Sequence, residues 1–213
     1  MGFRVAHLSE LASQSGVEGS TWIRVRKHFD IGAFGVNAYR AEEAGGRVIE
    51  EHTETGGSAG RHQELYFVAE GRARFSLGED EVVAPAGTFV FVRDPETRRG
   101  AIAEEPRTVV LVLGGRPGTP YSVSPWEEFG DAFPAYQAKD YAKAIELFRA
   151  ALEKFPDSAS GLYNLACCES LAGDRESALQ HLSRAIELDD QFRQYAQSDD
   201  DFDSIRSDRR FPA

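Results

Sequence analysis

The segment His62-Gln63-Glu64-Leu65-Tyr66 holds the densest group of side chains that could do chemistry. It lies in a run typical of a β-strand, and alternate residues of a strand point to the same face. His62, Glu64 and Tyr66 should therefore share one face. An imidazole, a carboxylate and a phenol together could move a proton, hold an ion or bind a small polar ligand.

Other reactive groups are poorly placed for chemistry. Cys167 and Cys168 are adjacent, so they cannot easily bridge one another or form a zinc knuckle. They fall in a predicted helix, where buried packing is the default role of a thiol. Glu50, Glu51 and Glu54 form a charge run beside a strand, which is usually a solvated edge. The sequence has no Gly-x-Ser-x-Gly elbow, so nothing supports an activated nucleophile.

Composition limits the classes of partner. The 213 residues carry a net charge of -11, which would repel nucleic acid and anionic membranes. No apolar run approaches the ~18 to 20 residues of a membrane helix, and the N-terminus shows no signal core. We therefore expect a cytoplasmic protein with neither a nucleic-acid partner nor a membrane partner.

The chain up to about residue 115 has the pattern of a β-barrel or sandwich. Short β-branched and aromatic runs alternate there with glycine-rich turns. The glycines and prolines of 114–120 can hold neither a helix nor a central strand. We expect an N-terminal extension at 1–19, a barrel at 20–115 and a linker at 116–122. The expected strands are 22–28, 33–41, 48–53, 64–68, 72–77, 81–84, 88–92 and 108–113.

The remaining residues, 123–213, have helical periodicity and an internal repeat. Ala144, Phe148 and Ala151 recur 34 residues later as Ala178, Leu182 and Ala185. That period resembles the helix pair of the tetratricopeptide repeat, a family of protein-binding scaffolds. We expect helices at 141–155 and 159–171, and a third helix from 191 to 197 that caps the repeats. The expected anchors of the cap are Phe202, Ile205 and Phe211.

The β-rich half resembles the cupin family over roughly residues 20–115. Glu64 is followed after six residues by Gly71, as in the second half of the first cupin motif, and Gly87 precedes a five-residue strand as in the second motif. The resemblance implies a double-stranded β-helix, that is, a β-barrel. The two resemblances together imply a multidomain α and β protein, with a cupin-like barrel followed by an all-α tetratricopeptide-like domain, a combination seen in bacterial proteins of no settled activity.

The cupin pattern fails at its metal ligands. The family places two histidines six and four residues before the glutamate, and a third eleven residues after the second motif's glycine. Here these positions hold Ser58, Gly60 and Arg98, so we expect no metal cofactor. The alternative is a rebuilt site for a divalent transition metal, which would use His52, His62 and Glu64.

In the metal-free interpretation, Arg98 takes the place of the ion. It would form a fork-shaped ion pair with Glu64 inside the barrel, or would hold the carboxylate or phosphate of a small anionic ligand. Tyr66 and His62 would line that ligand site. If Arg98 faces inward, Arg99 should face outward.

The sequence favours a non-enzymatic binding protein. The barrel would hold a small ligand or support the fold, the helices would bind a protein partner, and the cupin resemblance implies a homodimer. The alternative is an enzyme, either a metal-dependent oxygenase or isomerase that uses His52, His62 and Glu64, or a metal-free isomerase with His62 or Tyr66 as acid or base. A cupin fold alone does not decide between them.

Overall fold

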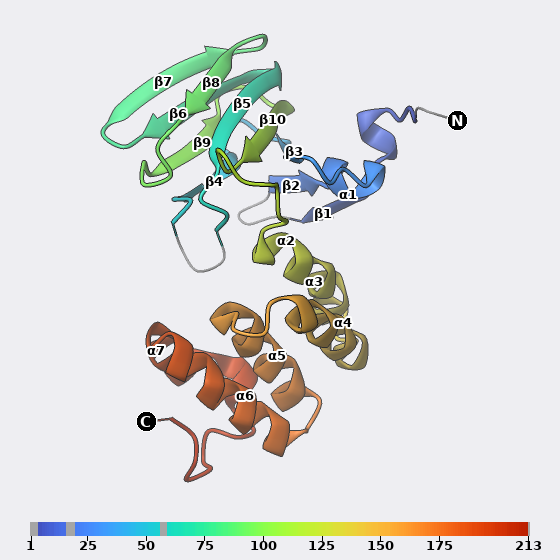
Figure 1. Cartoon of the computed structure of the whole chain (residues 1–213), viewed down its shortest axis with the longest axis vertical. Coiled ribbons are helices and arrows are strands. Elements are labelled where there is room, and N and C mark those ends of the chain that lie inside the picture. The colour runs from blue at the N-terminus through green and yellow to red at the C-terminus, as the bar shows by residue number, and fades with distance from the viewer. Residues whose placement is uncertain (1–3, 16–19, 56–58, 213) are drawn as a thin grey trace. The chain divides into compact units, whose positions relative to one another are not determined.

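The computed structural model describes residues 4–15, 20–55 and 59–212. The chain divides into two compact units, Met1–Val123 and Ser124–Ala213. Figure 1 shows that strands make up most of the first unit and that the second is helical. Residues 116–122, predicted as a linker, belong to the first unit, where the Tyr121 ring lies 5.7 Å from that of His62.

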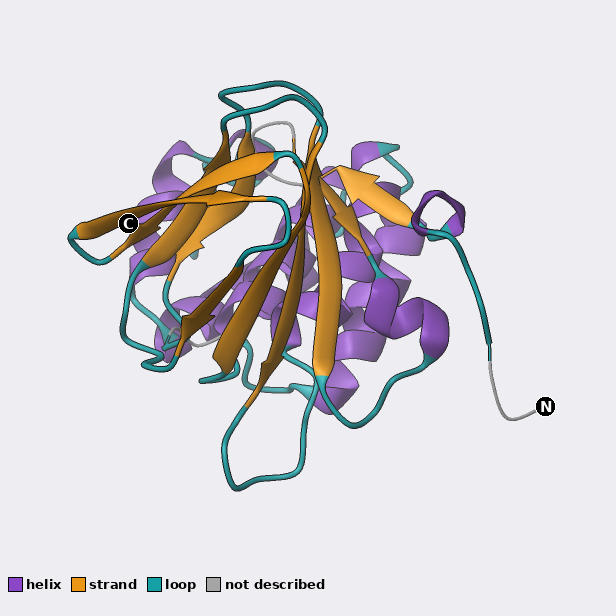
Figure 2. Ribbon diagram, turned by 90° about the horizontal axis from the view of Figure 1, so that it is seen from above, coloured by secondary structure: helices purple, strands orange, loops and turns teal. Residues whose placement is uncertain are grey.

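The first unit contains two antiparallel sheets (Figures 1 and 2). The six-stranded sheet has the order β1-β2-β3-β10-β5-β8, and the four-stranded sheet has the order β4-β9-β6-β7. The strands are β1 (Ser13–Ser15), β2 (Ser20–Ile23), β3 (Gly35–Ala41), β4 (Arg47–His52), β5 (Gln63–Glu70), β6 (Arg72–Leu77), β7 (Asp80–Pro85), β8 (Phe89–Val92), β9 (Arg99–Ala103) and β10 (Thr108–Gly115).

The core of this unit lies between the two sheets. Strand β5 alternates buried and half-buried residues, so that Glu64, Tyr66 and Val68 face inward. Tyr66 and Val68 meet Val48 of β4 and Phe75 of β6 in one apolar cluster. The β-barrel predicted from the sequence is therefore confirmed.

Two local predictions were wrong. The strand predicted at 22–28 ends at Ile23, and α1 (Val25–Phe29) follows it. Val25 and Phe29 are four residues apart, so both can pack on the same small cluster around Leu11. Strand β9 was not predicted, because Arg-Gly-Ala-Ile-Ala has little of the β-branched and aromatic content that marks a strand.

The second unit is built of helices. They are α2 (Pro125–Phe129), α3 (Phe133–Gln137), α4 (Tyr141–Lys154), α5 (Ala159–Leu171), α6 (Arg175–Leu188) and α7 (Gln191–Ser198). Short 3-10 turns occupy Leu8–Glu10, Gly130–Ala132 and Asp200–Phe202. No described helix has both the length and the apolar content needed to cross a bilayer.

The repeat predicted from sequence is present in the helices. Asp140 and Asp174 cap α4 and α6, and each side chain accepts a hydrogen bond from the backbone three residues later. The six repeat positions are all buried: Ala144, Phe148, Ala151, Ala178, Leu182 and Ala185. Cys167 and Cys168 are also buried and unbridged, as expected.

Candidate functional site

The described polar side chains of the barrel interior gather around Glu64 on β5. The Tyr66 hydroxyl donates a hydrogen bond to Glu64 Oε2 at 2.6 Å. His52, the last residue of β4, reaches the same oxygen from the other sheet, with Nε2 at 3.5 Å. Two strands far apart in sequence therefore bring a carboxylate, a phenol and an imidazole together.

The guanidinium beside Glu64 belongs to Arg99, which corrects the predicted pair of Glu64 with Arg98. Arg99 Nε lies 3.2 Å from Glu64 Oε2, and the Arg99 side chain is 0% exposed. Arg98 is 64% exposed and binds Glu51 on the surface through Nε, at 2.5 Å. Neighbouring residues of a strand face opposite sides, so a one-residue shift in register exchanges the two arginines.

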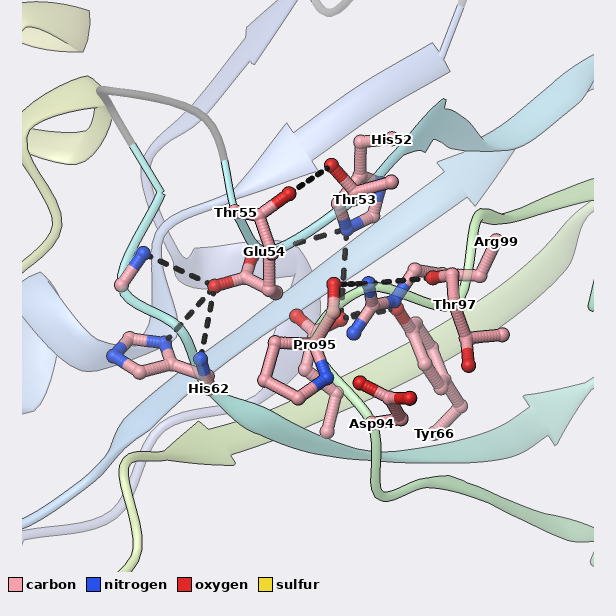
Figure 3. Close-up of polar contacts among 12 residues, drawn as sticks. His52, Thr53, Glu54, Thr55, His62, Tyr66, Asp94, Pro95, Thr97 and Arg99 are labelled. Carbon is pink, nitrogen blue, oxygen red and sulfur yellow. Dashed lines mark hydrogen bonds and ion pairs between the residues drawn. The ribbon is translucent and has the colours of Figure 1, made fainter. Parts of the chain in front are cut away.

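Backbone carbonyls fix the orientation of Arg99. Its Nη1 donates to the carbonyl of Pro95 at 3.0 Å and to that of Thr97 at 2.8 Å (Figure 3). Its Nε and Nη2 are buried and make no hydrogen bond of good geometry with any described residue. The contact between Nε and Glu64 is therefore an ion pair without the alignment of a hydrogen bond.

Glu54 joins the site, although the sequence pattern indicated a solvated edge for it. Its side chain is 7% exposed, and its Oε1 lies 3.9 Å from His52 Nε2. Its Oε2 accepts hydrogen bonds from the backbone N–H groups of Gly60 and His62, at 3.1 and 3.2 Å. A carboxylate that binds two backbone donors in this way is held in one orientation.

His62 does not belong to the group around Glu64 that was predicted for it. It precedes β5, and its Nδ1 lies 3.8 Å from Glu54 Oε2. Figure 3 shows Glu54 between His62 and His52. The structure thus gives the cluster His52, Glu54 and Glu64 in place of the predicted alternative His52, His62 and Glu64. Gly60 contributes a backbone donor, and Ser58 lies outside the described residues.

The charges in the cluster stabilise one another. Burial by itself raises the pKa of Glu64, but hydrogen bonds from His52 and Tyr66 and the positive charges nearby outweigh burial and hold the pKa below its ordinary value. Burial lowers the pKa of His52, yet its contacts with Glu64 and the Glu50 carbonyl raise it overall. Burial raises the pKa of Tyr66 well above its ordinary value, so its hydroxyl remains a donor.

The donor set fits a divalent transition metal ion. One ligand atom each from His52, Glu54 and Glu64 can be chosen so that all lie within 4.8 Å of one another. His52 Nε2 lies 3.9 Å from Glu54 Oε1 and 3.5 Å from Glu64 Oε2, separations that pairs of bonds of ~2.0 to 2.2 Å to one ion can span. His52 Nδ1 lies 2.7 Å from the Glu50 carbonyl, and donation to it would leave Nε2 to bind the ion. One imidazole with two carboxylates suits Zn²⁺, Fe²⁺ or Mn²⁺, while Arg99 offsets one of the negative charges.

The sequence did contain a signal for Glu54 that was not used. His52 and Glu54 are two residues apart at the end of a strand, which would place them on one face if the extended backbone continued. The spacing of the cupin motif, counted back from Glu64, falls instead on Ser58 and Gly60. Glu54 lies farther from Glu64 in the sequence than that spacing allows, so the spacing does not find His52 and Glu54.

Comparison with known proteins agrees with the two-part organisation. Residues 135–198 match the family model described as tetratricopeptide repeat. The N-terminal half is similar in fold to solved cupin structures. No curated protein matches this sequence.

The solved structures are distant in sequence. KdgF from a Halomonas species has 19% identity and a TM-score of 0.42, over 50% of this chain and 88% of that one. A sugar phosphate isomerase of the cupin superfamily from Silicibacter pomeroyi has 18% identity and a TM-score of 0.45, over 56% and 82%. An RmlC-like cupin from Shewanella frigidimarina has 13% identity and a TM-score of 0.41, over 55% and 95%. The barrel unit is therefore similar to these cupin structures, and the helical unit matches the tetratricopeptide repeat over residues 135–198.

Proposed function

We propose that the protein is a binding module whose barrel holds a divalent transition metal ion and whose helices bind a protein partner. The observation that carries the metal assignment is the convergence of His52, Glu54 and Glu64 from two sheets. Tyr66, Arg99 and the Glu50 carbonyl hold the proposed ligands in place. The tetratricopeptide match supports the protein-binding role of the second unit.

The charge of the cluster favours a cation over the predicted small anionic ligand. The cluster contains two carboxylates, Glu54 and Glu64, and only Glu64 is paired with the buried guanidinium of Arg99 among the described contacts. Arg98, which was to hold the anion, points to the surface. An ion that bound here would displace the proton from His52 and would replace it with a stronger positive charge.

Metal binding is expected to depend on Glu54 and not on its exposed neighbour Glu51. Chelator-treated protein without a histidine tag should bind about one equivalent of Zn²⁺, Fe²⁺ or Mn²⁺ per chain by calorimetry and plasma mass spectrometry. Glu54→Gln should weaken binding by more than about tenfold, since even the loss of an outer-shell partner costs that much.

Glu51→Gln is the matched control for this measurement. It removes the same charge from a residue close in sequence, but Glu51 points to the surface and pairs with Arg98. Metal affinity should therefore be unchanged. Wild-type protein that binds no ion, or equal losses in the two variants, would contradict the metal assignment.

A metal-free ligand site remains the second candidate. One observation favours it: Arg99 Nη2 is buried and makes no hydrogen bond with a described residue. An acceptor oxygen of a small carboxylate or phosphate could satisfy it. If the wild type binds no metal but is stabilised against heat by such an anion, and Arg99→Lys abolishes that effect, this candidate replaces the first.

The assembly and the location of the protein stay predictions. We propose a homodimer, as the cupin resemblance implies, and a cytoplasmic location. Light scattering after size exclusion measures the first. A dimer should have twice the 23.5 kDa of one chain.

A further inference from the structure

One outer face of the barrel carries apolar side chains, although the outer face of such a sheet is expected to contact water. It comprises Leu65 and Phe67 of β5, Phe89 and Phe91 of β8 and Leu113 of β10, and we call these five residues the β5–β8 face. Cross-strand pairing aligns Leu113 with Leu65 and Leu65 with Phe91. Phe67 pairs with Phe89, and their rings are 4.5 Å apart. Phe89 is 62% exposed and Phe91 is 53% exposed.

The outer face of the other sheet exposes Val83 and Ile102, but it places charged pairs among them. On β6, Arg74 forms ion pairs with Glu81 and Glu104, and Arg72 pairs with Glu105. An antiparallel sheet with one face in water normally has such polar residues. The β5–β8 face lacks them, and a contiguous exposed apolar patch of this kind marks an interaction surface.

Strand β8 is also an edge strand that nothing in its sequence protects. It is the last strand of the six-stranded sheet and consists of Phe-Val-Phe-Val. Strand β7, the edge of the other sheet, begins with Asp80 and Glu81 and ends at Pro85. Charges and proline discourage edge pairing, and their absence from β8 leaves its backbone open to another strand.

The described part of the helical unit offers no matching apolar face. Its exposed large apolar side chains are Trp126 and Tyr195, which lie in different helices. Each chain carries a net charge of -11, so two copies repel one another over most of their surface. The uncharged β5–β8 face is where two copies can approach at the least electrostatic cost.

We propose that the β5–β8 face is the surface through which two copies of this chain associate. A two-fold axis at Val90 pairs β8 with its counterpart in antiparallel fashion, because a two-fold contact is self-complementary. It places Phe89 of one copy opposite Phe91 of the other, as a cross-strand aromatic pair. This assignment of the surface rests on the proposed homodimer.

The test compares two exposed apolar residues, each on an edge strand. Phe91→Lys puts a charge next to the proposed two-fold axis at Val90, whereas Val83→Lys puts one on β7, where Val83 is 42% exposed. The dimer dissociation constant of the full chain, from sedimentation equilibrium, should rise at least about 30-fold for Phe91→Lys, as for loss of an aromatic hot spot. It should not change for Val83→Lys.

The possible outcomes test the assignment of the β5–β8 face separately from the existence of the homodimer. A wild-type monomer at micromolar concentration overturns both. A wild-type dimer that Phe91→Lys leaves intact overturns the surface and keeps the homodimer. Equal weakening by both variants also overturns the surface. If Phe91→Lys is monomeric but unfolds near the wild-type temperature, the variant has lost the dimer contact and not its fold.

Discussion

Arg99→Leu is expected to destabilise the barrel by about 3 to 5 kcal/mol, the usual cost of removing one partner from a buried ion pair. Glu64 would keep its charge in a site where its side chain is only 10% exposed. The carbonyls of Pro95 and Thr97 would also lose the donor that binds them. Urea unfolding, followed by circular dichroism of the barrel's aromatic residues, measures the loss.

Arg98→Leu is the matched control, because it removes the same group from the adjacent residue. Arg98 is 64% exposed and its partner Glu51 is 44% exposed, so the stability should hardly change. The double variant Glu64→Leu with Arg99→Leu should recover part of the loss, since it leaves no unpaired charge. A large loss of stability in Arg98→Leu but not in Arg99→Leu would mean that the inward and outward arginines are assigned the wrong way round.

The two arginines show why the sequence could not predict the site. A barrel was predictable because alternation and turns are local properties, and the inward positions of Glu64 and Tyr66 followed from β5 alone. Which of Arg98 and Arg99 faces Glu64 depends on the turn that precedes β9 and on its pairing with β4, where His52 opposes Arg99. Pairing between distant strands leaves no mark in the local pattern.

The helical unit was more predictable for the same physical reason. Its repeat positions contact neighbours within the same or the next helix, so the period of 34 residues fixes much of the packing. Two carboxylates of the acidic run at 199–203 bind tyrosine hydroxyls of the helical unit. In the structure Asp199 accepts a hydrogen bond from the Tyr163 hydroxyl, and Asp201 accepts one from that of Tyr136.

The C-terminal cap is expected to contribute much of the stability of the helices. Phe202 is 0% exposed, and its ring lies 5.4 Å from that of Tyr163 on α5. Ile205 is 1% exposed in the same cluster, against which Phe211 packs in part. These are the three anchors predicted from sequence. A terminal repeat needs such a cap because one of its faces has no further repeat to cover it.

Phe202→Ala should therefore destabilise the helical unit by about 3 to 5 kcal/mol, as for other buried aromatic residues. The helical signal at 222 nm, a wavelength at which strands contribute little, is expected to disappear at a lower urea concentration. Tyr195→Ala is the control, because this aromatic residue on the neighbouring helix is 52% exposed. If the two variants unfold together with the wild type, the C-terminal residues do not hold the repeats in place. If only Phe202→Ala unfolds early, the proposed protein-binding surface of the helices depends on a residue that is itself buried.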